Sequence, residues 1–345
     1  MSPSGRFKWR EDHLLESWKY RNVLVTGGAG LIGSYLVEHL LQDGARVRVA
    51  DNLQSGSLKN LSACLSSIDF LELNLQDPAA CRKAVQGMDT VFDLAARTVG
   101  IGYSSLHHGE MFYDSMMTSM NTLEASRQAG VEHYLVTSSS CVYTDGSPIP
   151  TPESAAERNL PEEANTGYGW AKRMAELQGT FYGREYGMHV AIVRLVNAYG
   201  PRYHWDHEEP HVIPALIQRL LAAENPLVIW GSGRQTRSFI HASDVATLMK
   251  LVLERAKNVD PVNIGCTEET TIANLVMELT AIAGYKDRVI YDTTKPEGPS
   301  RKCLDLSHQQ SLVGDFIPRF SLREGLRQTF DAARELRPSQ ATFGK

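Results

Sequence analysis

Tyr168 and Lys172 lie four positions apart in a segment whose pattern predicts a helix over about 165–186. At that spacing both side chains share one helix face. A lysine there can depress the pKa of the tyrosine, and the phenolate then removes a hydroxyl proton while a hydride leaves the same carbon. Ser139 follows a predicted strand at 132–138, where its hydroxyl can meet the tyrosine. These three residues predict the oxidation of an alcohol.

A glycine-rich turn follows a predicted strand at 22–26 and precedes a predicted helix. In such a turn Gly27 makes the tight bend, Gly30 lets the backbone approach a pyrophosphate, and Gly33 lets the helix lie close on the sheet. Asp51 ends the next predicted strand, about 20 residues later. Its carboxylate would accept hydrogen bonds from a ribose and repel a 2′-phosphate. The pattern therefore predicts NAD, in preference to NADP, as the cofactor.

The elements that hold these residues alternate between strands and helices. Strands are expected at 22–26, 46–51, 68–73, 89–94, 132–138 and 189–195, and helices at about 108–128 and 165–186 and from Asp77. Alternation with short loops indicates right-handed βαβ units. We therefore predict an α/β fold, with a doubly wound parallel sheet of the Rossmann type and a smaller C-terminal α/β substrate lobe.

The 345 residues exceed one average domain, and the pattern changes after residue 201. We expect an N-terminal extension at 1–20, an NAD-binding Rossmann domain at 21–201, and a substrate-binding lobe at 202–235 and 267–335. Segment 236–266 is expected to return to the first domain, through the strand-like stretch 237–241, a helix from Asp244 and a strand at 262–265.

The composition excludes several classes of protein. Lys and Arg total 35 against 40 Asp and Glu, with no long basic run, which argues against nucleic-acid binding. No apolar stretch approaches the ~18–20 residues of a membrane span, and the N-terminus lacks the apolar core of a secretion signal. Five widely spaced cysteines make a disulfide framework and a cysteine zinc site improbable. A cytoplasmic enzyme is expected.

Taken together, the motifs resemble the extended short-chain dehydrogenase/reductase family, in its nucleotide-sugar epimerase branch. The resemblance runs from about residue 21 to 335 and rests on the motifs at 26–30, 51–53, 94–96, 168–172, 194–201 and 262–265. It implies a nucleotide-sugar substrate and tightly bound NAD. It also implies a homodimer in which the helices at 108–128 and 165–186 pair. Tyr168 would be the base, Lys172 its electrostatic support, and Ser139 a partner of the sugar O4.

Two enzymes of this branch, GDP-mannose 3,5-epimerase and GDP-fucose synthase, are similar in further detail. Each carries a proton-transferring cysteine, and Cys141 lies two residues beyond Ser139 in this sequence. His211 begins a segment that resembles the one whose histidine partners that cysteine in GDP-fucose synthase. A ketone at C4 acidifies the protons on C3 and C5, so Cys141 and His211 would exchange ring protons and invert one or both centres.

The resemblance also implies a set of binding residues. Beyond Gly27, Gly30, Gly33, Asp51, Tyr168 and Lys172, the cofactor would contact Leu31, Ile32, Asn52, Asn74, Leu75, Leu94, Ala95 and Ala96. The substrate would contact Gly102, Tyr103, Asn197, Val212, Arg237 and Arg301. The two arginines would hold the diphosphate through bidentate contacts.

Several alternatives stay open. One is an epimerase that then reduces its product, as GDP-fucose synthase does, although Asp51 argues against NADPH. Another is a simple 4-epimerase or dehydratase in which Cys141 and His211 are structural, although the Asp-Glu pair that a dehydratase normally has after the serine motif is replaced here by Cys141 and Val142. A third is a catalytically silent NAD-sensing protein. A zinc site formed by His204, His207 and His211 with Asp206, Glu208 and Glu209 is disfavoured, because Pro210 interrupts the helix that would align them. No metal is expected.

Overall fold

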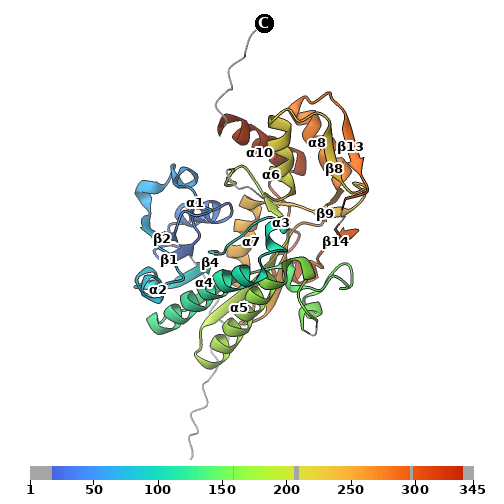
Figure 1. The fold of residues 1–345 in the computed structure, drawn as a ribbon. Coiled ribbons are helices and arrows are strands. Elements are labelled where there is room, and N and C mark those ends of the chain that lie inside the picture. The colour runs from blue at the N-terminus through green and yellow to red at the C-terminus, as the bar shows by residue number, and fades with distance from the viewer. Residues whose placement is uncertain (1–17, 158, 206–209, 296–297, 337–345) are drawn as a thin grey trace, which may run out of the picture.

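A seven-stranded parallel sheet forms the centre of the molecule (Figure 1). The computed structural model describes residues 18–157, 159–205, 210–295 and 298–336. The strand order is β11-β6-β5-β4-β1-β2-β3. The strands are β1 (Asn22–Thr26), β2 (Arg46–Asp51), β3 (Asp69–Glu72), β4 (Thr90–Asp93), β5 (His133–Ser139), β6 (His189–Leu195) and β11 (Pro261–Ile264). The order reverses direction at β1, which confirms the predicted doubly wound fold.

Helices cover both faces of this sheet, and the alternation of side chains in β1 shows why. Val23 and Val25 point into one apolar cluster and Leu24 into the other, and all three are fully buried. The first cluster is closed by α1 (Gly33–Gln42) and α7 (Ala242–Arg255), with α9 (Ser307–Val313) beside α7. The second is closed by α2 (Pro78–Val85), α4 (His108–Ala129) and α5 (Thr166–Glu185). Burial on two faces requires near-continuous apolar strands.

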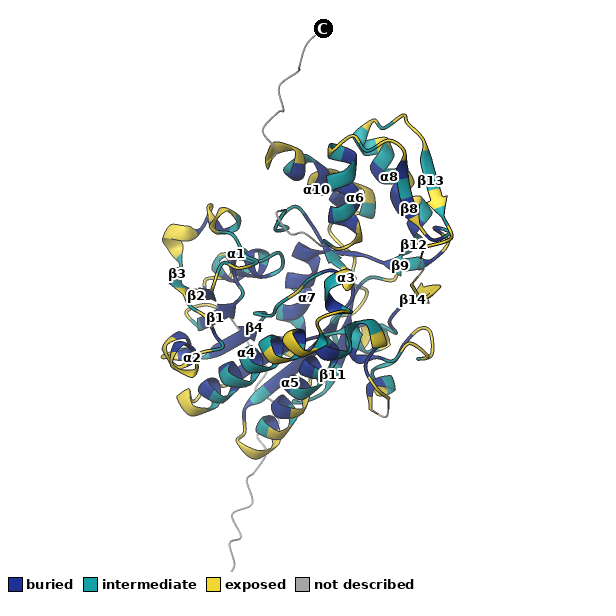
Figure 2. Ribbon diagram, in the orientation of Figure 1, coloured by how far each residue is buried: buried dark blue, intermediate teal, exposed yellow. Residues whose placement is uncertain are grey.

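A separate apolar cluster holds the C-terminal part of the chain together (Figure 2). Its helices are α6 (Val212–Leu221), α8 (Ile272–Ala283) and α10 (Leu322–Leu336). They pack with β8 (Leu227–Trp230), which pairs with β13 (Val289–Asp292). The remaining helices of the described residues are short. They are α3 (Ile101–Ser104), η1 (Leu58–Leu61), η2 (Leu65–Ser67), η3 (Ser140–Val142), η4 (Glu153–Ala156) and η5 (Glu163–Asn165).

The stretch predicted as one strand at 237–241 is divided between two small sheets. β9 (Thr236–Ser238) lies between β12 (Glu269–Thr271) and β14 (Arg301–Lys302), whereas β10 (Ile240–His241) pairs with β7 (Ala198–Tyr199). Phe239 is buried in the C-terminal cluster, and the next residue, Ile240, is buried in the first cluster of the large sheet. The sequence predicts that 236–266 returns to the first domain; within this segment, β9 belongs to a small sheet of its own, and Ile240 is where the chain enters the first cluster. The chain crosses between the two cores at this point.

The predicted N-terminal extension lies outside the described residues up to position 17. Trp18 is buried in the first cluster, 5.6 Å from Phe92 between ring centroids. Within the described part of the chain, no helix combines the length and the apolar character that crossing a membrane requires.

A buried ion pair fastens α5 to the sheet. Arg194 on β6 donates to both carboxylate oxygens of Glu176 on α5, at 2.7 and 2.9 Å. Ser138 on β5 donates to the same carboxylate at 2.5 Å, and Arg194 also donates to the Tyr143 hydroxyl at 3.1 Å. Since α5 carries Tyr168 and Lys172, this network positions the predicted catalytic residues.

Glu176→Ala is expected to lower the free energy of unfolding by about 3–5 kcal/mol, because it leaves the Arg194 guanidinium buried without its carboxylate. Urea denaturation measures the loss. Glu185→Ala removes an exposed carboxylate from the same helix and serves as the control. Equal unfolding free energies in the two variants would contradict this role for the pair.

Candidate active site

A cavity of about 570 Å³ opens at the carboxyl ends of the parallel strands. Residues that follow β1, β2, β4, β5 and β6 line one side of it, and the start of α6 with residues of β9 and β14 lines another. Ligands of open α/β sheets bind at this edge, and the volume is typical of small-molecule sites. The cavity therefore is the candidate active site.

The glycine turn forms one end of the cavity. Gly27 has a φ of +64°, which favours glycine, and this confirms the predicted tight bend. A Cβ on Gly33 would lie only 2.3 Å from the carbonyl oxygen of Gly27. Gly33 is thus needed for the close approach of α1 to the turn itself, and not to the sheet as expected from the sequence. The start of α1 and the turn can then face one anion together.

Asp51 lies beside this turn and is buried. One carboxylate oxygen accepts from the Ala29 N–H at 3.0 Å and the other from the Leu53 N–H at 2.8 Å. Burial raises the pKa of Asp51, and these two backbone N–H groups oppose that rise. A carboxylate offers about four acceptor positions, so two remain for ribose hydroxyls. The turn and this acid fit the dinucleotide that the sequence predicts.

All of the predicted cofactor residues line this cavity, namely Gly27, Gly30, Leu31, Ile32, Gly33, Asp51, Asn52, Asn74, Leu75, Leu94, Ala95, Ala96, Tyr168 and Lys172. The segment after β4 is held by Thr26. Its hydroxyl donates to the buried Asp93 at 2.9 Å and accepts from the N–H groups of Leu94 and Ala95, both at 3.0 Å. These hydrogen bonds hold the backbone of Leu94 and Ala95 against the end of β1, where both residues line the cavity.

Tyr168 and Lys172 share one face of α5, and the Lys172 Nζ lies 5.5 Å from the centre of the Tyr168 ring. Burial raises the pKa of Tyr168, and Cys141 adds to the rise. The depressed tyrosine pKa expected from the sequence is therefore wrong for the chain by itself. Burial also lowers the pKa of Lys172, while Asp93 and Glu176 oppose it. The ammonium charge is partly offset by these two carboxylates.

Ser139 and Cys141 lie side by side where β5 ends. The Cys141 N–H donates to the Ser139 hydroxyl at 3.2 Å, and both residues line the cavity. Burial raises the pKa of Cys141 to about 12, the Lys302 ammonium opposes the rise, and the Glu162 carboxylate adds to it. Cys141 is consequently a thiol near neutral pH and can donate a proton.

His211 is exposed on the opposite part of the lining, directly before α6. Its side chain makes no capping hydrogen bond to that helix. Of the alternative zinc site, residues 206–209 lie outside the described residues. The described residues contain no group of three or more His, Cys, Asp and Glu that could hold a metal ion.

Three predicted substrate residues line the cavity. Arg237 is held by its Nη1, which donates to the carbonyl oxygens of Thr236 at 2.7 Å and Pro299 at 2.9 Å. Asn197 donates from Nδ2 to the Ser238 carbonyl at 3.0 Å, which ties it to β9. Val212 lines the cavity at the first turn of α6.

The other three, Gly102, Tyr103 and Arg301, do not line the cavity. Arg301 makes a bidentate ion pair with Glu269, at 2.6 and 2.9 Å, and its side chain is 45% exposed. The Tyr103 hydroxyl donates to Glu110 at 2.5 Å, and its ring stacks on His107. Its helix reaches the cavity instead through Ile101 and Ser104, which lie on the other face.

Five charged residues in the lining were not predicted from the sequence, namely Arg97, Asp114, Asp145, Glu162 and Lys302. Glu162 and Lys302 lie closest to the predicted catalytic residues in their electrostatic effect, since both act on Cys141. Their side chains form an ion pair at 2.5 Å across 140 residues of sequence. Glu162 lies in a loop without periodic pattern. Lys302 could have been found from the strand at 301–302, because neighbouring residues of a strand point to opposite faces.

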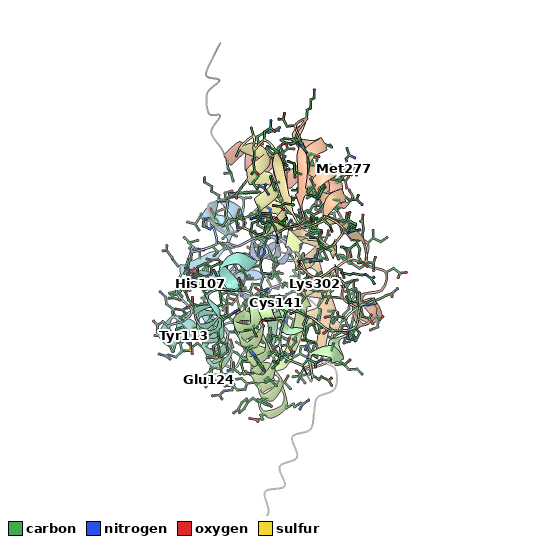
Figure 3. All side chains as sticks on the ribbon, turned by 45° about the vertical axis from the view of Figure 1, so that its right-hand side comes forward. His107, Tyr113, Glu124, Cys141, Met277 and Lys302 are labelled. Atoms are coloured by element: carbon green, nitrogen blue, oxygen red, sulfur yellow. The ribbon has the colours of Figure 1, made fainter. Side chains whose placement is uncertain are left out.

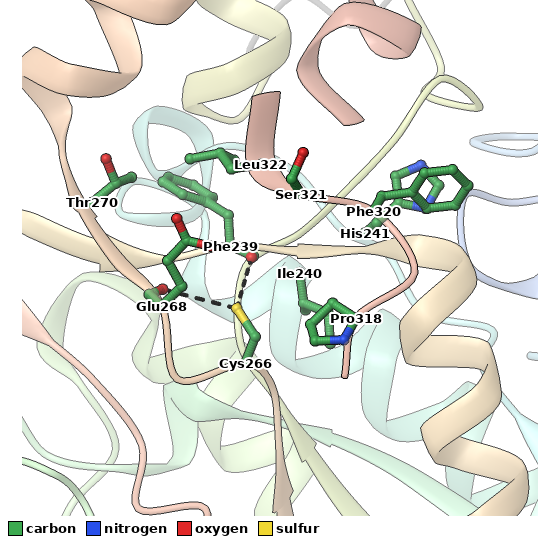
Figure 4. Close-up of a pocket in the computed structure, with 10 residues that line it drawn as sticks. All are labelled: Phe239, Ile240, His241, Cys266, Glu268, Thr270, Pro318, Phe320, Ser321 and Leu322. Carbon is green, nitrogen blue, oxygen red and sulfur yellow. Dashed lines mark hydrogen bonds between the residues drawn. The ribbon is translucent and has the colours of Figure 1, made fainter. Parts of the chain in front are cut away.

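A second, smaller cavity of about 200 Å³ lies between β10 and the start of α10 (Figure 4). Phe239, His241 and Phe320 form apolar parts of its lining, and the Cys266 thiol points to the Phe239 carbonyl oxygen at 3.0 Å. None of its described lining residues is among those predicted for catalysis or binding.

Comparison with known proteins gives consistent results. The model of a family described as "NAD dependent epimerase/dehydratase family" matches residues 23–265. GDP-L-fucose synthase of Escherichia coli is 31% identical, over 90% of this chain and 95% of its own. dTDP-4-dehydro-6-deoxy-D-allose reductase of a Streptomyces species is 30% identical, over 91% and 96%. The solved UDP-glucose 4-epimerase of Thermotoga maritima, with UDP-glucose, is 30% identical, with a TM-score of 0.80 over 91% and 99%.

Proposed function

The chain belongs to the NAD dependent epimerase/dehydratase family, and from that premise we propose that it epimerises a nucleotide-diphosphate sugar at C3, C5 or both. The substrate resembles GDP-mannose, and the reaction passes through a 4-keto intermediate. The observation that carries the proposal is that Tyr168, Cys141 and His211 line the same cavity as the glycine turn. A 4-epimerase needs the first of these residues but has no use for the other two.

The residues divide the reaction into two stages, an oxidation at C4 and an exchange of protons at the neighbouring ring carbons. Tyr168 removes the proton from the sugar O4 hydroxyl, with Ser139 as its hydrogen-bonding partner and Lys172 as the nearby positive charge. NAD, which the glycine turn and Asp51 would hold, would supply the hydride acceptor for C4. The C4 ketone acidifies C3 and C5. His211 then removes a ring proton, and the Cys141 thiol delivers one to the opposite face.

Binding of the nucleotide diphosphate is assigned to cationic side chains of the C-terminal part of the cavity. Arg237 keeps its guanidinium in the lining through two backbone carbonyls. Arg301 was expected beside it, but its charge is taken up by Glu269. The guanosine nucleotide rests on the similarity to GDP-L-fucose synthases, while relatives named for dTDP and UDP sugars are as similar in sequence.

A reductase that also epimerises is the second candidate. Two relatives, a GDP-L-fucose synthase and a dTDP-4-dehydro-6-deoxy-D-allose reductase, favour it by their names. Asp51 disfavours NADPH, because its carboxylate faces the cavity where a 2′-phosphate would lie.

Incubation with GDP-mannose, UDP-sugars and dTDP-sugars distinguishes the two candidates when the amount of reduced cofactor consumed per product is measured. The epimerase converts a nucleotide sugar with no added cofactor. The reductase instead consumes one reduced cofactor for each product formed. Conversion that stops without equimolar NADPH would contradict the epimerase.

Asp51→Ala is expected to weaken NAD binding about tenfold and to relax the discrimination against NADP, since a charged acceptor of the ribose is lost. Calorimetric titration of both cofactors measures the two effects. Glu72→Ala, which removes an exposed acid in register with Asp51 on the next strand, is the control. Wild-type protein that binds NADP more tightly than NAD would contradict the role of Asp51.

A homodimer through α4 and α5 completes the proposal. The two helices lie side by side and leave large apolar side chains exposed, namely Tyr113, Leu177 and Phe181. Such a face is typical of a protein–protein interface.

A further inference from the structure

Cys141 does not stand alone in the cavity, because Glu162 and Lys302 line it as well. Figure 3 labels Cys141 and Lys302 in the middle of the molecule. The Glu162 N–H donates to the Cys141 carbonyl oxygen at 3.2 Å, and the Glu162 carboxylate and the Cys141 thiol line the cavity close enough for each to shift the pKa of the other. The other end of that carboxylate binds the Lys302 ammonium at 2.5 Å. Asn165 donates to Glu162 as well. Cys141, Glu162 and Lys302 thus form a row of neighbouring residues, linked by the Glu162 N–H and by the Glu162–Lys302 ion pair.

Both members of the ion pair are charged. Burial raises the pKa of Glu162, but Lys302 and the hydrogen bonds outweigh it, so that this pKa lies below its usual value. Burial lowers the pKa of Lys302, but the effects of Cys141 and Glu162 are larger, so that this pKa lies above its usual value. A charge pair held at 8% exposure of Glu162 needs close partners to offset its desolvation. The Cys141 thiol is one of these partners.

We propose that Glu162 and Lys302 are positioning residues that orient the Cys141 thiol and restore its proton after each transfer. The inference rests on the proposed function, in which Cys141 is the acid. In the transfer the S–H bond breaks and a C–H bond forms at the ring carbon, which leaves a thiolate. The thiolate regains a proton from Lys302 through Glu162, and solvent returns a proton to Lys302. No oxidant or further reactant is required.

Other charged and titratable groups surround this row. Tyr168 and Lys172 face Cys141 from α5, and Arg237 faces Glu162 and Lys302 from β9. In the register of β9 and β14, Lys302 lies directly beside Arg237. The variants below leave all three of these residues in place, so their charges act equally on each protein compared.

The alkylation rate of Cys141 by iodoacetamide tests the arrangement without any substrate. The rate is followed for each cysteine peptide by mass spectrometry, at one pH of about 9. Glu162→Gln removes the negative charge and is expected to speed the reaction, whereas Lys302→Met removes the positive charge and is expected to slow it. A change of one pKa unit alters the thiolate fraction tenfold, and the opposite change in nucleophilicity leaves about a threefold effect.

The opposite signs are the decisive feature. Loosening of the cavity alone would speed the alkylation in both variants, and that result, or unchanged rates, would overturn the proposal. Glu163→Gln and Lys286→Met remove exposed charges of the same kinds and should leave the rate as it is. Cys81, a buried residue of α2 whose thiol donates to the Leu75 carbonyl oxygen, reports within each sample that the fold is intact.

Solvent deuterium uptake into the sugar separates this proposal from the function it rests on. If Cys141 titrates as described but wild-type protein exchanges no ring proton, the proposed function fails while the electrostatic arrangement stands. If wild-type protein exchanges protons and Glu162→Gln and Lys302→Met do so equally well, the arrangement has no role in turnover. The proposal predicts a loss of about tenfold or more in both variants.

Discussion

Tyr168→Phe will lower turnover by a factor on the order of 10²–10⁴, because only the phenolic oxygen that takes the O4 proton is removed. The ring remains in place on α5, and the cation–ring contact with Lys172 remains possible. NAD binding should therefore stay close to that of the wild type. Steady-state assays of epimerisation, together with titration of NAD, measure the two quantities.

The position of Tyr168 makes this prediction sharp. Burial raises the pKa of its hydroxyl, and the residue lines the cavity beside Ser139 and Lys172. A variant that loses activity because it binds no NAD would say nothing about the proton transfer. Tyr20→Phe, which alters an exposed tyrosine outside the cavity, is the matched control. Undiminished turnover in Tyr168→Phe would remove the oxidation step from the mechanism.

Cys141→Ser will separate the two halves of the reaction. The hydroxyl is close to the thiol in size, but in the same surroundings an alcohol is a much weaker acid than a thiol, so the residue loses most of its ability to donate a proton. Exchange of ring protons should fall by a factor on the order of 10²–10⁴, the usual contribution of a positioned acid or base. Reduction of bound cofactor by the sugar should survive, because it depends on Tyr168.

Both quantities should be measured in the same sample, with the absorbance of the reduced cofactor and deuterium in the sugar as the readouts. Cys266→Ser changes the other partly exposed thiol, which lines the smaller cavity, and serves as the control. Normal exchange at C3 and C5 in Cys141→Ser would leave Cys141 as a structural residue and favour epimerisation at C4.

Local patterns in the sequence were sufficient for the parallel sheet and the cofactor side of the cavity. Strand, glycine turn and helix follow one another within a few residues, so Gly27, Gly33 and Asp51 could be assigned from spacing alone. In a parallel sheet the carboxyl ends of the strands meet at one edge, which brings Ser139 and Asn197 to the same cavity.

The substrate side could not be predicted as well, because its residues meet through tertiary contacts. Glu162 and Lys302 are 140 residues apart, and no spacing rule connects them. Arg301 was chosen in place of its neighbour, although side chains alternate along a strand and only Lys302 lies beside Arg237. Tyr103 was predicted wrongly for a similar reason. In the short helix α3, Ile101 and Ser104 face the cavity, and Tyr103 lies on another side of the helix.

Deuterium uptake by the wild-type protein tests the central claim most directly. The protein is incubated with GDP-mannose in deuterated water, without added cofactor, and the recovered nucleotide sugars are examined by NMR for deuterium at each ring carbon. The mechanism predicts deuterium at C3, C5 or both, with no net reduction of the sugar. Turnover of GDP-mannose without deuterium at either carbon would contradict it.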